Sequence, residues 1–271
     1  MKTIIIPTDF SDNALRAFDY ARALFGDDPK YVLLNTYVEP RSTSASMVSL
    51  RDILHEGSVE GLSELSHQIK NGPNPPPNFE TLSEYGDPEN AICNAARIHK
   101  ADLIVMGTKG ATGLKEVFMG SVAAGVFQNA TCPVIAVPND AVLRAPKNVL
   151  LAADLKSDIE ESHKMLLANI IEKNHGSLSI LTVDTNGDDI SVEEAEHGYD
   201  IHVQFQNLEH AFDVVDSEDP ESAILEYSKV NEMDMIVTIP RKSGWLKRLI
   251  GKSISEKLAE HSNIPVLALK H

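Results

Sequence analysis

The sequence is poor in cysteine, in tryptophan and in basic residues. Its two cysteines among 271 residues are too few for a disulfide framework or a four-cysteine metal site. The 40 acids outnumber the 24 bases, which gives a formal charge of -16. Such a balance argues against general binding to nucleic acid or to anionic lipid, because both select basic surfaces. We therefore expect no nucleic-acid partner.

Long apolar runs are missing as well. The sequence has no stretch of 18 apolar residues, so we predict no transmembrane helix and no stable membrane association. Its first apolar stretch reaches Asp9 before it is long enough for a secretory signal, and it lacks a small-residue cleavage site. These absences predict a cytoplasmic protein. With 42% hydrophobic residues, the chain is able to bury a core without covalent staples.

An internal repeat divides the chain. The segment Lys2 to Asp9 resembles Lys147 to Asp154, 145 positions later. Such self-similarity indicates a duplicated module. We predict two domains, residues 1–140 and 146–271, joined by a short polar stretch. Three further segments recur at a common offset of 132: Asp87-Pro88-Glu89 as Asp219-Pro220-Glu221, Asp102 to Val105 as Asp234 to Val237, and Cys132-Pro133-Val134 as Ile264-Pro265-Val266.

Short apolar runs alternate with amphipathic segments in both copies. The apolar runs predict buried strands, and Ser11 is the expected N-cap of the first helix. This alternation is typical of a parallel sheet covered by helices on both faces. Expected strands are 4–6, 32–34, 79–82, 103–106, 134–137, 149–151, 178–183 and 235–237; expected helices are 15–25, 50–69, 89–99, 121–130 and 192–208.

A glycine-rich loop follows the expected strand 103–106. Its spacing is G-x2-G-x9-G-S, formed by Gly107, Gly110, Gly120 and Ser121. Glycines after a strand let the backbone approach a ligand and expose N–H groups, and Ser121 opens an apolar helix whose N-terminus attracts anions. The loop indicates a phosphate site at the carboxyl edge of the sheet, and ordinary turns are the alternative.

Two familiar phosphate-binding patterns do not fit. The dinucleotide fingerprint requires G-x-G, which the glycine-rich loop lacks. Gly251-Lys252-Ser253 ends like a P-loop, but Leu246 stands where the leading glycine belongs.

Together these motifs resemble the universal stress protein family in its tandem form. The resemblance covers nearly the whole chain and implies two Rossmann-like α/β sandwich domains of the adenine-nucleotide alpha hydrolase type, each with a five-stranded, mostly parallel sheet. It also implies a cytoplasmic role in the stress response, and the complete glycine loop is similar to that of the ATP-binding members. The segments that carry the resemblance are Ile6 to Ser11, Gly86-Asp87-Pro88, Asp102 to Gly107, the glycine-rich loop and Cys132-Pro133-Val134.

The resemblance further implies which residues of the first copy would contact ATP, or ADP or AMP, together with Mg²⁺. Asp9 would lie near the ribose or a metal-bound phosphate, Thr36 along the adenine, and Lys109 would add charge. No catalytic residue and no protein metal site is expected. The full set is Pro7, Thr8, Asp9, Thr36, Met106, Gly107, Lys109, Gly110, Gly120, Ser121 and Val122.

The second copy departs from the pattern at every critical glycine. Ile239, Lys242 and Lys252 replace the three loop glycines, and Ser253 alone is retained opposite Ser121. We therefore predict one nucleotide site, in the first copy. By family analogy the copies pair through their last strands as an intramolecular pseudo-dimer, and tandem chains could associate further as a homodimer.

Three functions stay open. We favour a nucleotide-binding regulatory protein read by an unidentified protein partner. The alternative is an interaction or scaffold module that binds no nucleotide. Its docking surface would be the basic segment Arg241 to Lys252. A solvated loop and a weak membrane contact are the other interpretations of that segment. The acidic segment Asp184 to Asp200 lacks the EF-hand order and is expected to be solvated. A slow ATP hydrolase is the third possibility, but no nucleophile–base pair stands out, so we expect no enzyme.

Overall fold

The computed structural model describes residues 3–39, 47–110, 119–153, 159–185, 192–239 and 253–270. The chain forms two compact units, Met1–Asn139 and Asp140–His271, and each is described by itself. Within the described part of the chain, no helix is both long and apolar enough to cross a membrane. The basic segment Arg241 to Lys252, together with Asp154 and residues 186–191 of the acidic segment, lies outside the described residues.

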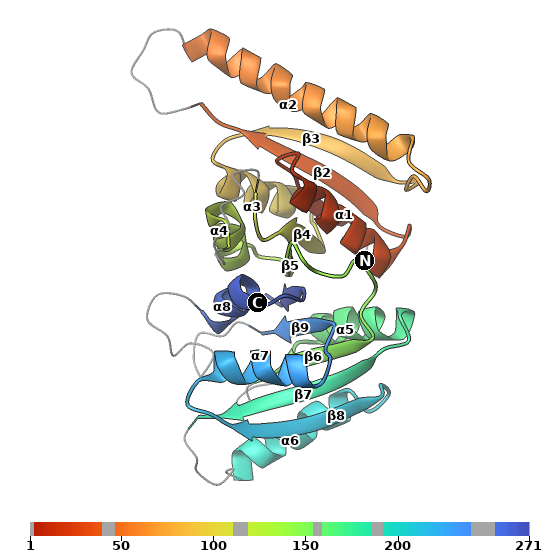
Figure 1. Cartoon of the computed structure of the whole chain (residues 1–271), viewed down its shortest axis with the longest axis vertical. Coiled ribbons are helices and arrows are strands. Elements are labelled where there is room, and N and C mark those ends of the chain that lie inside the picture. Colours follow the sequence, from red (N-terminus) through yellow and green to blue (C-terminus); the bar gives the residue numbers. More distant parts are fainter. Residues whose placement is uncertain are drawn as a thin grey trace. The chain divides into compact units, whose positions relative to one another are not determined.

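The first unit is a parallel sheet with helices on both faces (Figure 1). The strand order is β3-β2-β1-β4-β5, and all four neighbouring pairs are parallel. Its elements are β1 (Thr3–Pro7), α1 (Asp12–Phe25), β2 (Lys30–Tyr37), α2 (Met47–Lys70), β3 (Phe79–Tyr85), α3 (Pro88–Ile98), β4 (Leu103–Gly107), α4 (Ser121–Asn129) and β5 (Val134–Val137).

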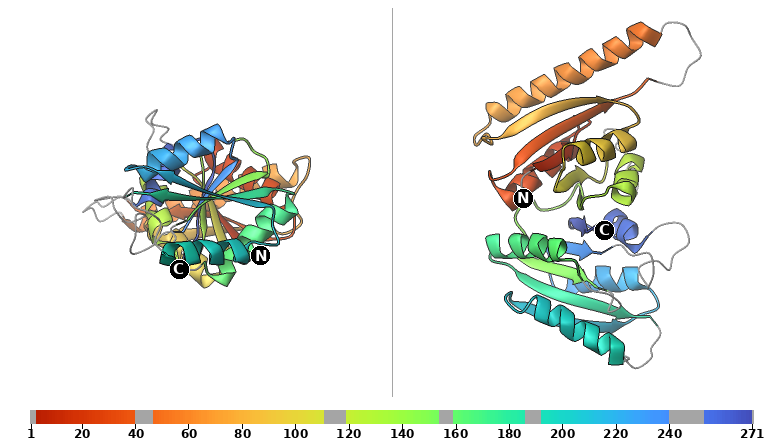
Figure 2. Two further views of the ribbon diagram at one scale, coloured as in Figure 1. Left: turned by 90° about the horizontal axis from the view of Figure 1, so that it is seen from below. Right: turned by 180° about the vertical axis from the view of Figure 1, so that it is seen from behind.

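The direction of winding reverses between β1 and β4. The chain runs outward from β1 to β2 and β3, then returns to the other side of β1 to form β4 and β5. Right-handed crossovers therefore place α1 and α2 on one face of the sheet and α3 and α4 on the other. The right view of Figure 2 shows α2 running along β2 and β3. In open α/β sheets, ligands bind at the carboxyl ends of the strands beside such a reversal.

The helix starts next to this reversal are fixed by short polar side chains. Ser11 caps α1, as the sequence predicted, since its hydroxyl accepts a hydrogen bond from the backbone N–H of Ala14 at 3.3 Å. Asp87 caps α3 in the same way by accepting from Asn90, and Pro88 occupies the first helical position, where its missing N–H costs nothing. β1 and β4 are buried almost throughout, so both strands reach the site from a rigid core.

The second unit repeats the architecture with the strand order β10-β9-β6-β7-β8, again parallel between neighbours. The predicted fold class is therefore confirmed in both units. Its elements are β6 (Asn148–Ala152), α5 (Glu161–Lys173), β7 (Ser177–Asp184), α6 (Val192–Gln204), β8 (His210–Asp216), α7 (Pro220–Val230), β9 (Met235–Thr238), α8 (Ile254–His261) and β10 (Val266–Ala268).

The two units differ most between their second and third strands. α2 has 24 residues and its counterpart α6 has 13, which accounts for most of the shift between the two repeat offsets. The sequence predicted α6 to reach Leu208, but it ends at Gln204. The chain turns there because the N–H of Leu208 bonds to the carbonyl of Phe205 at 2.8 Å, three residues back rather than four.

Candidate functional site

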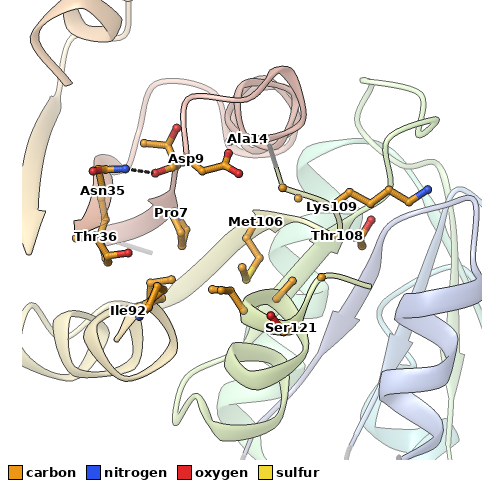
Figure 3. Close-up of a pocket in the computed structure, with 18 residues that line it drawn as sticks. Pro7, Asp9, Ala14, Asn35, Thr36, Ile92, Met106, Thr108, Lys109 and Ser121 are labelled. Atoms are coloured by element: carbon orange, nitrogen blue, oxygen red, sulfur yellow. Dashed lines mark hydrogen bonds between the residues drawn. The ribbon is translucent and has the colours of Figure 1, made fainter. Parts of the chain in front are cut away.

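A pocket of about 380 Å³ lies at the carboxyl edge of the first sheet, where the winding reverses (Figure 3). Its size falls in the range of small-molecule sites. All the residues that the sequence singled out as nucleotide contacts line this one pocket. The lining residues are Pro7, Thr8, Asp9, Ala14, Leu34, Asn35, Thr36, Pro88, Ile92, Met106, Gly107, Thr108, Lys109, Gly110, Gly120, Ser121, Val122 and Ala123.

The turn after β1 holds the Asp9 carboxylate in place. The Oδ1 atom of Asp9 accepts hydrogen bonds from the backbone N–H of Ser11 at 3.1 Å and from its hydroxyl at 2.5 Å. Phe10, between them, has a φ of 63° in the left-handed region, and its N–H donates to the Thr8 hydroxyl at 3.0 Å. Such a conformation is uncommon outside glycine and is kept only where its surroundings fix it. The turn therefore presents Asp9 in one orientation.

A buried asparagine ties the ends of β1 and β2 together. The side-chain amide of Asn35 donates to the carbonyl of Thr8 at 2.7 Å, as the dashed line in Figure 3 shows. Asn35 is 8% exposed, so this bond is shielded from water. Thr36, the next residue, lines the pocket and is part-exposed. Thr36 was expected at the site and Asn35 was not. At the end of the second strand, the sequence has no pattern that separates a residue bonding two strands together from one that contacts a ligand.

Two of the loop glycines are required by the protein's own packing. A Cβ atom on Gly107 would lie 2.5 Å from the side-chain nitrogen of Asn13, which itself donates to the Lys109 carbonyl at 2.7 Å. A Cβ atom on Gly110 would lie 2.7 Å from Oδ2 of Asp9. Both distances are shorter than real Cβ contacts, so a side chain at Gly107 would displace Asn13, whose backbone oxygen is also 3.0 Å away, and one at Gly110 would displace the Asp9 carboxylate. Asn13 was not among the expected site residues, because it lies between the predicted N-cap Ser11 and the predicted helix 15–25, where nothing in the sequence marks a contact to the loop.

Gly120 has no such requirement. Its φ of -58° and ψ of 146° suit any residue. A Cβ atom there would meet its nearest neighbours, the Thr108 carbonyl oxygen at 3.5 Å and the Gly110 nitrogen at 4.0 Å, in ordinary contact. Gly120 is the N-cap of α4 but supplies no side-chain cap, although serine or aspartate would cap the helix better. Glycine here therefore leaves open space in front of the helix.

The first turn of α4 provides the donors that this space exposes. The N–H groups of Ser121, Val122 and Ala123 have no partner within the helix, because they precede its first i to i+4 bond. All three residues line the pocket. Unpaired N–H groups at a helix start, together with the helix dipole, favour an anion.

The pocket holds little charge. Among its described lining residues, Asp9 is the one acid and Lys109 the one base. Figure 3 shows the Lys109 side chain extending away from Pro7 and Thr36, so its backbone rather than its amine faces the site. Asp9 points toward the loop of Lys109 and Gly110, where one carboxylate and a ligand's phosphates are sufficient to hold Mg²⁺ with water.

The sequence analysis also missed the apolar side of the pocket. Leu34, Pro88, Ile92 and Ala14 complete it with Met106. Pro88 and Ile92 come from α3, whose motif Asp87-Pro88-Glu89 was used to find the repeat and not the site. An apolar wall opposite a polar helix terminus suits a ligand with a flat apolar ring and an anionic end.

Comparison with known proteins identifies the family. Residues 1–138 and again residues 146–270 match the Universal stress protein family. The chain belongs to the universal stress protein family, in its tandem form. A universal stress protein of Methanocaldococcus jannaschii is 36% identical over 141 residues, 50% of this chain and 81% of that relative. One from Mycobacterium tuberculosis is 30% identical over 139 residues, 50% of this chain and 95% of that protein.

One solved universal stress protein structure matches both domains of this chain. The crystal structure from Archaeoglobus fulgidus superposes with a TM-score of 0.76 at 23% identity, and the match covers 99% of this chain and 98% of that one. At that level of identity the likeness shows the shared two-domain fold.

The second universal stress domain closes the corresponding position with its own side chains. Ile239, the counterpart of Gly107, is 1% exposed. At the start of α8 the Ser253 hydroxyl accepts from the Glu256 N–H at 3.2 Å, and the Glu256 carboxylate accepts from the Ser253 N–H at 2.6 Å. This is a complete capping box, and Glu256 is buried. The Glu256 carboxylate thus lies at the start of α8, whereas no side chain caps the start of α4. The other two replacements, Lys242 and Lys252, lie outside the described residues.

Proposed function

We propose that the first domain binds an adenine nucleotide, ATP or else ADP or AMP, with Mg²⁺, and that occupancy regulates the protein in the cytoplasmic stress response. One observation carries the proposal. The residues implied by the resemblance converge on one pocket that contains an uncapped helix terminus and a glycine with no structural reason to be glycine.

The pocket offers a separate place for each part of such a ligand. Phosphates would meet the N–H groups at the start of α4, beside Gly120. The apolar wall formed by Ile92, Met106 and Leu34 would accept the adenine ring. Asp9, fixed by Ser11, would hold a ribose hydroxyl or Mg²⁺, and the metal would offset the repulsion between carboxylate and phosphate.

We propose a single nucleotide site per chain. In the second domain Ile239 is buried where the loop backbone would approach a phosphate, and Glu256 satisfies the helix terminus that an anion would need. An added phosphate would meet a buried carboxylate there, and the like charges would repel.

We further propose that the protein binds the nucleotide without rapid turnover. Phosphoryl transfer needs a positioned base or water and cationic groups around the transferred phosphate. The described lining residues offer Asp9, already hydrogen-bonded by Ser11, and a lysine that extends away. Phosphate release by the purified protein at rates typical of kinases would contradict this assignment.

Calorimetric titration with Mg-ATP of protein stripped of bound nucleotide tests the site. Gly120→Ala places one methyl group in the space before α4, where it meets the Thr108 carbonyl and the Gly110 nitrogen only in ordinary contact. We expect a small loss of melting temperature, because alanine is a poorer N-cap than glycine, and at least tenfold weaker binding. Gly57→Ala is the matched control, since an added Cβ at Gly57 of α2 meets nothing within 4 Å. We expect this control to bind like the wild type.

The outcomes separate the candidate functions. One site per chain, weakened by Gly120→Ala alone, supports the proposal. If Gly120→Ala bound Mg-ATP as tightly as the wild type, the phosphates would not bind at the start of α4. No binding at millimolar ATP, ADP or AMP would favour the interaction or scaffold module, and partner capture through the basic segment Arg241 to Lys252 would then be the next experiment.

A further inference from the structure

Two histidine side chains lie in contact in the second domain, outside the nucleotide pocket. His202 lies in the last turn of α6, and His210 opens β8. The Nε2 atom of His210 lies 2.7 Å from Nδ1 of His202, and their ring centroids are 4.6 Å apart. The two nitrogens therefore face each other at hydrogen-bond distance, although eight residues separate them in the chain.

A backbone carbonyl fixes one of the two rings. The Nδ1 atom of His210 lies 3.0 Å from the carbonyl oxygen of Leu208, which accepts only a hydrogen bond. The proton of neutral His210 is therefore on Nδ1, and its Nε2 presents a lone pair to His202. When the His202 proton is on Nε2, its Nδ1 presents a second lone pair to the same point. A carbonyl behind an imidazole is the usual support of a metal-binding histidine.

The separation of the nitrogens indicates which metal ion fits. With metal–nitrogen bonds of about 2.0 Å, two ligands at a right angle are about 2.8 Å apart, and two tetrahedral ligands are about 3.3 Å apart. The observed 2.7 Å is the distance of a hydrogen bond between the two rings, and it is also close to the first value, so small ring rotations would bring both nitrogens onto one ion. Imidazoles at a right angle are typical of tetragonal Cu²⁺ and Ni²⁺, and Cu²⁺ binds such donors most tightly of the first-row divalent ions.

The surroundings leave room for the remaining ligands. His202 is exposed, so water is able to complete the coordination. The exposed acids Glu196 and Asp200 of α6 precede it, and the chain carries a charge of -16, which concentrates cations near the surface. No group of three or more His, Cys, Asp or Glu in the described part of the chain is arranged around a metal, so this pair is a two-histidine site.

We propose that His202 and His210 form a binding site for a tetragonal divalent transition-metal ion, Cu²⁺ or Ni²⁺, with water as the other ligands. For the ion to bind, the His202 proton moves from Nδ1 to Nε2 of the same ring, so that both facing nitrogens offer lone pairs and no proton is released overall. This site is independent of the nucleotide pocket, which lies in the first domain.

Electron paramagnetic resonance of the whole chain with one equivalent of CuCl₂ tests the proposal. We expect a tetragonal spectrum with hyperfine coupling to two imidazole nitrogens. His202→Ala should remove one of these nitrogens and weaken Cu²⁺ binding at least tenfold, and His210→Ala should do the same. His67→Ala, which removes an exposed histidine from the last turn of α2, is the matched control and should leave both spectrum and affinity unchanged.

The contrary result is clear-cut. A two-nitrogen spectrum that survives both His202→Ala and His210→Ala, or equal affinity in all three variants, would place the copper on other groups and overturn the site. Circular dichroism of each variant establishes that the second domain is folded, and His202→Ala is the safer change because that ring is exposed.

Discussion

The side-chain amide of Asn13 donates a 2.7 Å hydrogen bond to the carbonyl of Lys109 and, in doing so, fills the space that a side chain on Gly107 would need. One residue of α1 thus holds the glycine loop and dictates its first glycine. The buried Oδ1 atom of Asn13 has no hydrogen-bond partner among the described residues, so the amide is oriented by the loop alone.

Gly107→Ala should destabilise the first domain by about 1–3 kcal/mol through overpacking against Asn13. Asn13→Ala should recover part of that loss in the double variant, because the nearest conflicting atom is the Asn13 side-chain nitrogen. A thermal-unfolding double-mutant cycle measures the coupling, and strictly additive effects would show that the two positions do not share this space.

Ser121 and Ser253 are equivalent in sequence but should respond differently to alanine. Ser253→Ala removes a capping bond of α8 and should cost about 1 kcal/mol of stability without changing nucleotide affinity. Ser121 supplies no cap to α4, so Ser121→Ala should leave stability nearly unchanged and weaken nucleotide binding. Denaturant unfolding measures the stability of both variants, and calorimetry measures their nucleotide affinity. A loss of stability in Ser121→Ala together with a loss of affinity in Ser253→Ala would place the nucleotide in the second domain.

Lys109→Ala should change Mg-ATP affinity less than threefold, because the amine extends away from the pocket and backbone N–H groups face the phosphates. Titrations at two salt concentrations provide the check. A large loss that shrinks at high salt would mean that Lys109 swings in to pair with the ligand.

Asp234 should make stability depend on pH. Burial raises its pKa, but hydrogen bonds from Arg144 and from the backbone N–H groups of Lys147 and Asn148 outweigh this and hold the pKa below its ordinary value of 3.8. The carboxylate therefore stabilises the fold above about pH 4, and that contribution is lost as the pH falls through the lowered pKa.

Asp234→Asn should accordingly cost about 1.5–3 kcal/mol at pH 7, the usual range for hydrogen bonds to a charged group, and the gap to wild type should narrow below pH 4. Urea unfolding at pH 7 and pH 3 measures both. Arg144→Ala removes one of the hydrogen bonds that lower the Asp234 pKa but leaves the two backbone bonds, and because the Arg144 side chain is 66% exposed we expect a smaller loss than for Asp234→Asn. If the difference in unfolding free energy between Asp234→Asn and the wild type did not change with pH, the charge of the carboxylate would not explain the stabilisation.

The parts of the fold that sequence predicted well are those with a local signal. Ser11 before an amphipathic segment predicted the N-cap of α1, and the apolar run Leu103 to Met106 predicted β4. β8 gave no such signal, because most of its residues are exposed and none is fully buried. The glycine loop was predicted from its spacing, and the residues on strand ends from the family resemblance. Asn13 and Asn35 instead depend on contacts across 96 and 27 positions of the chain, which no local pattern encodes.

The capping box of α8 makes the start of this helix independent of any ligand. Ser253 and Glu256 bond to each other's backbone N–H groups through their own side chains. Isoleucine and lysine stand in the second domain at the positions of glycines that the first domain retains, and Ile239 is buried. The second domain thus carries within its own chain the group that caps the helix, and its fold requires nothing bound at that place.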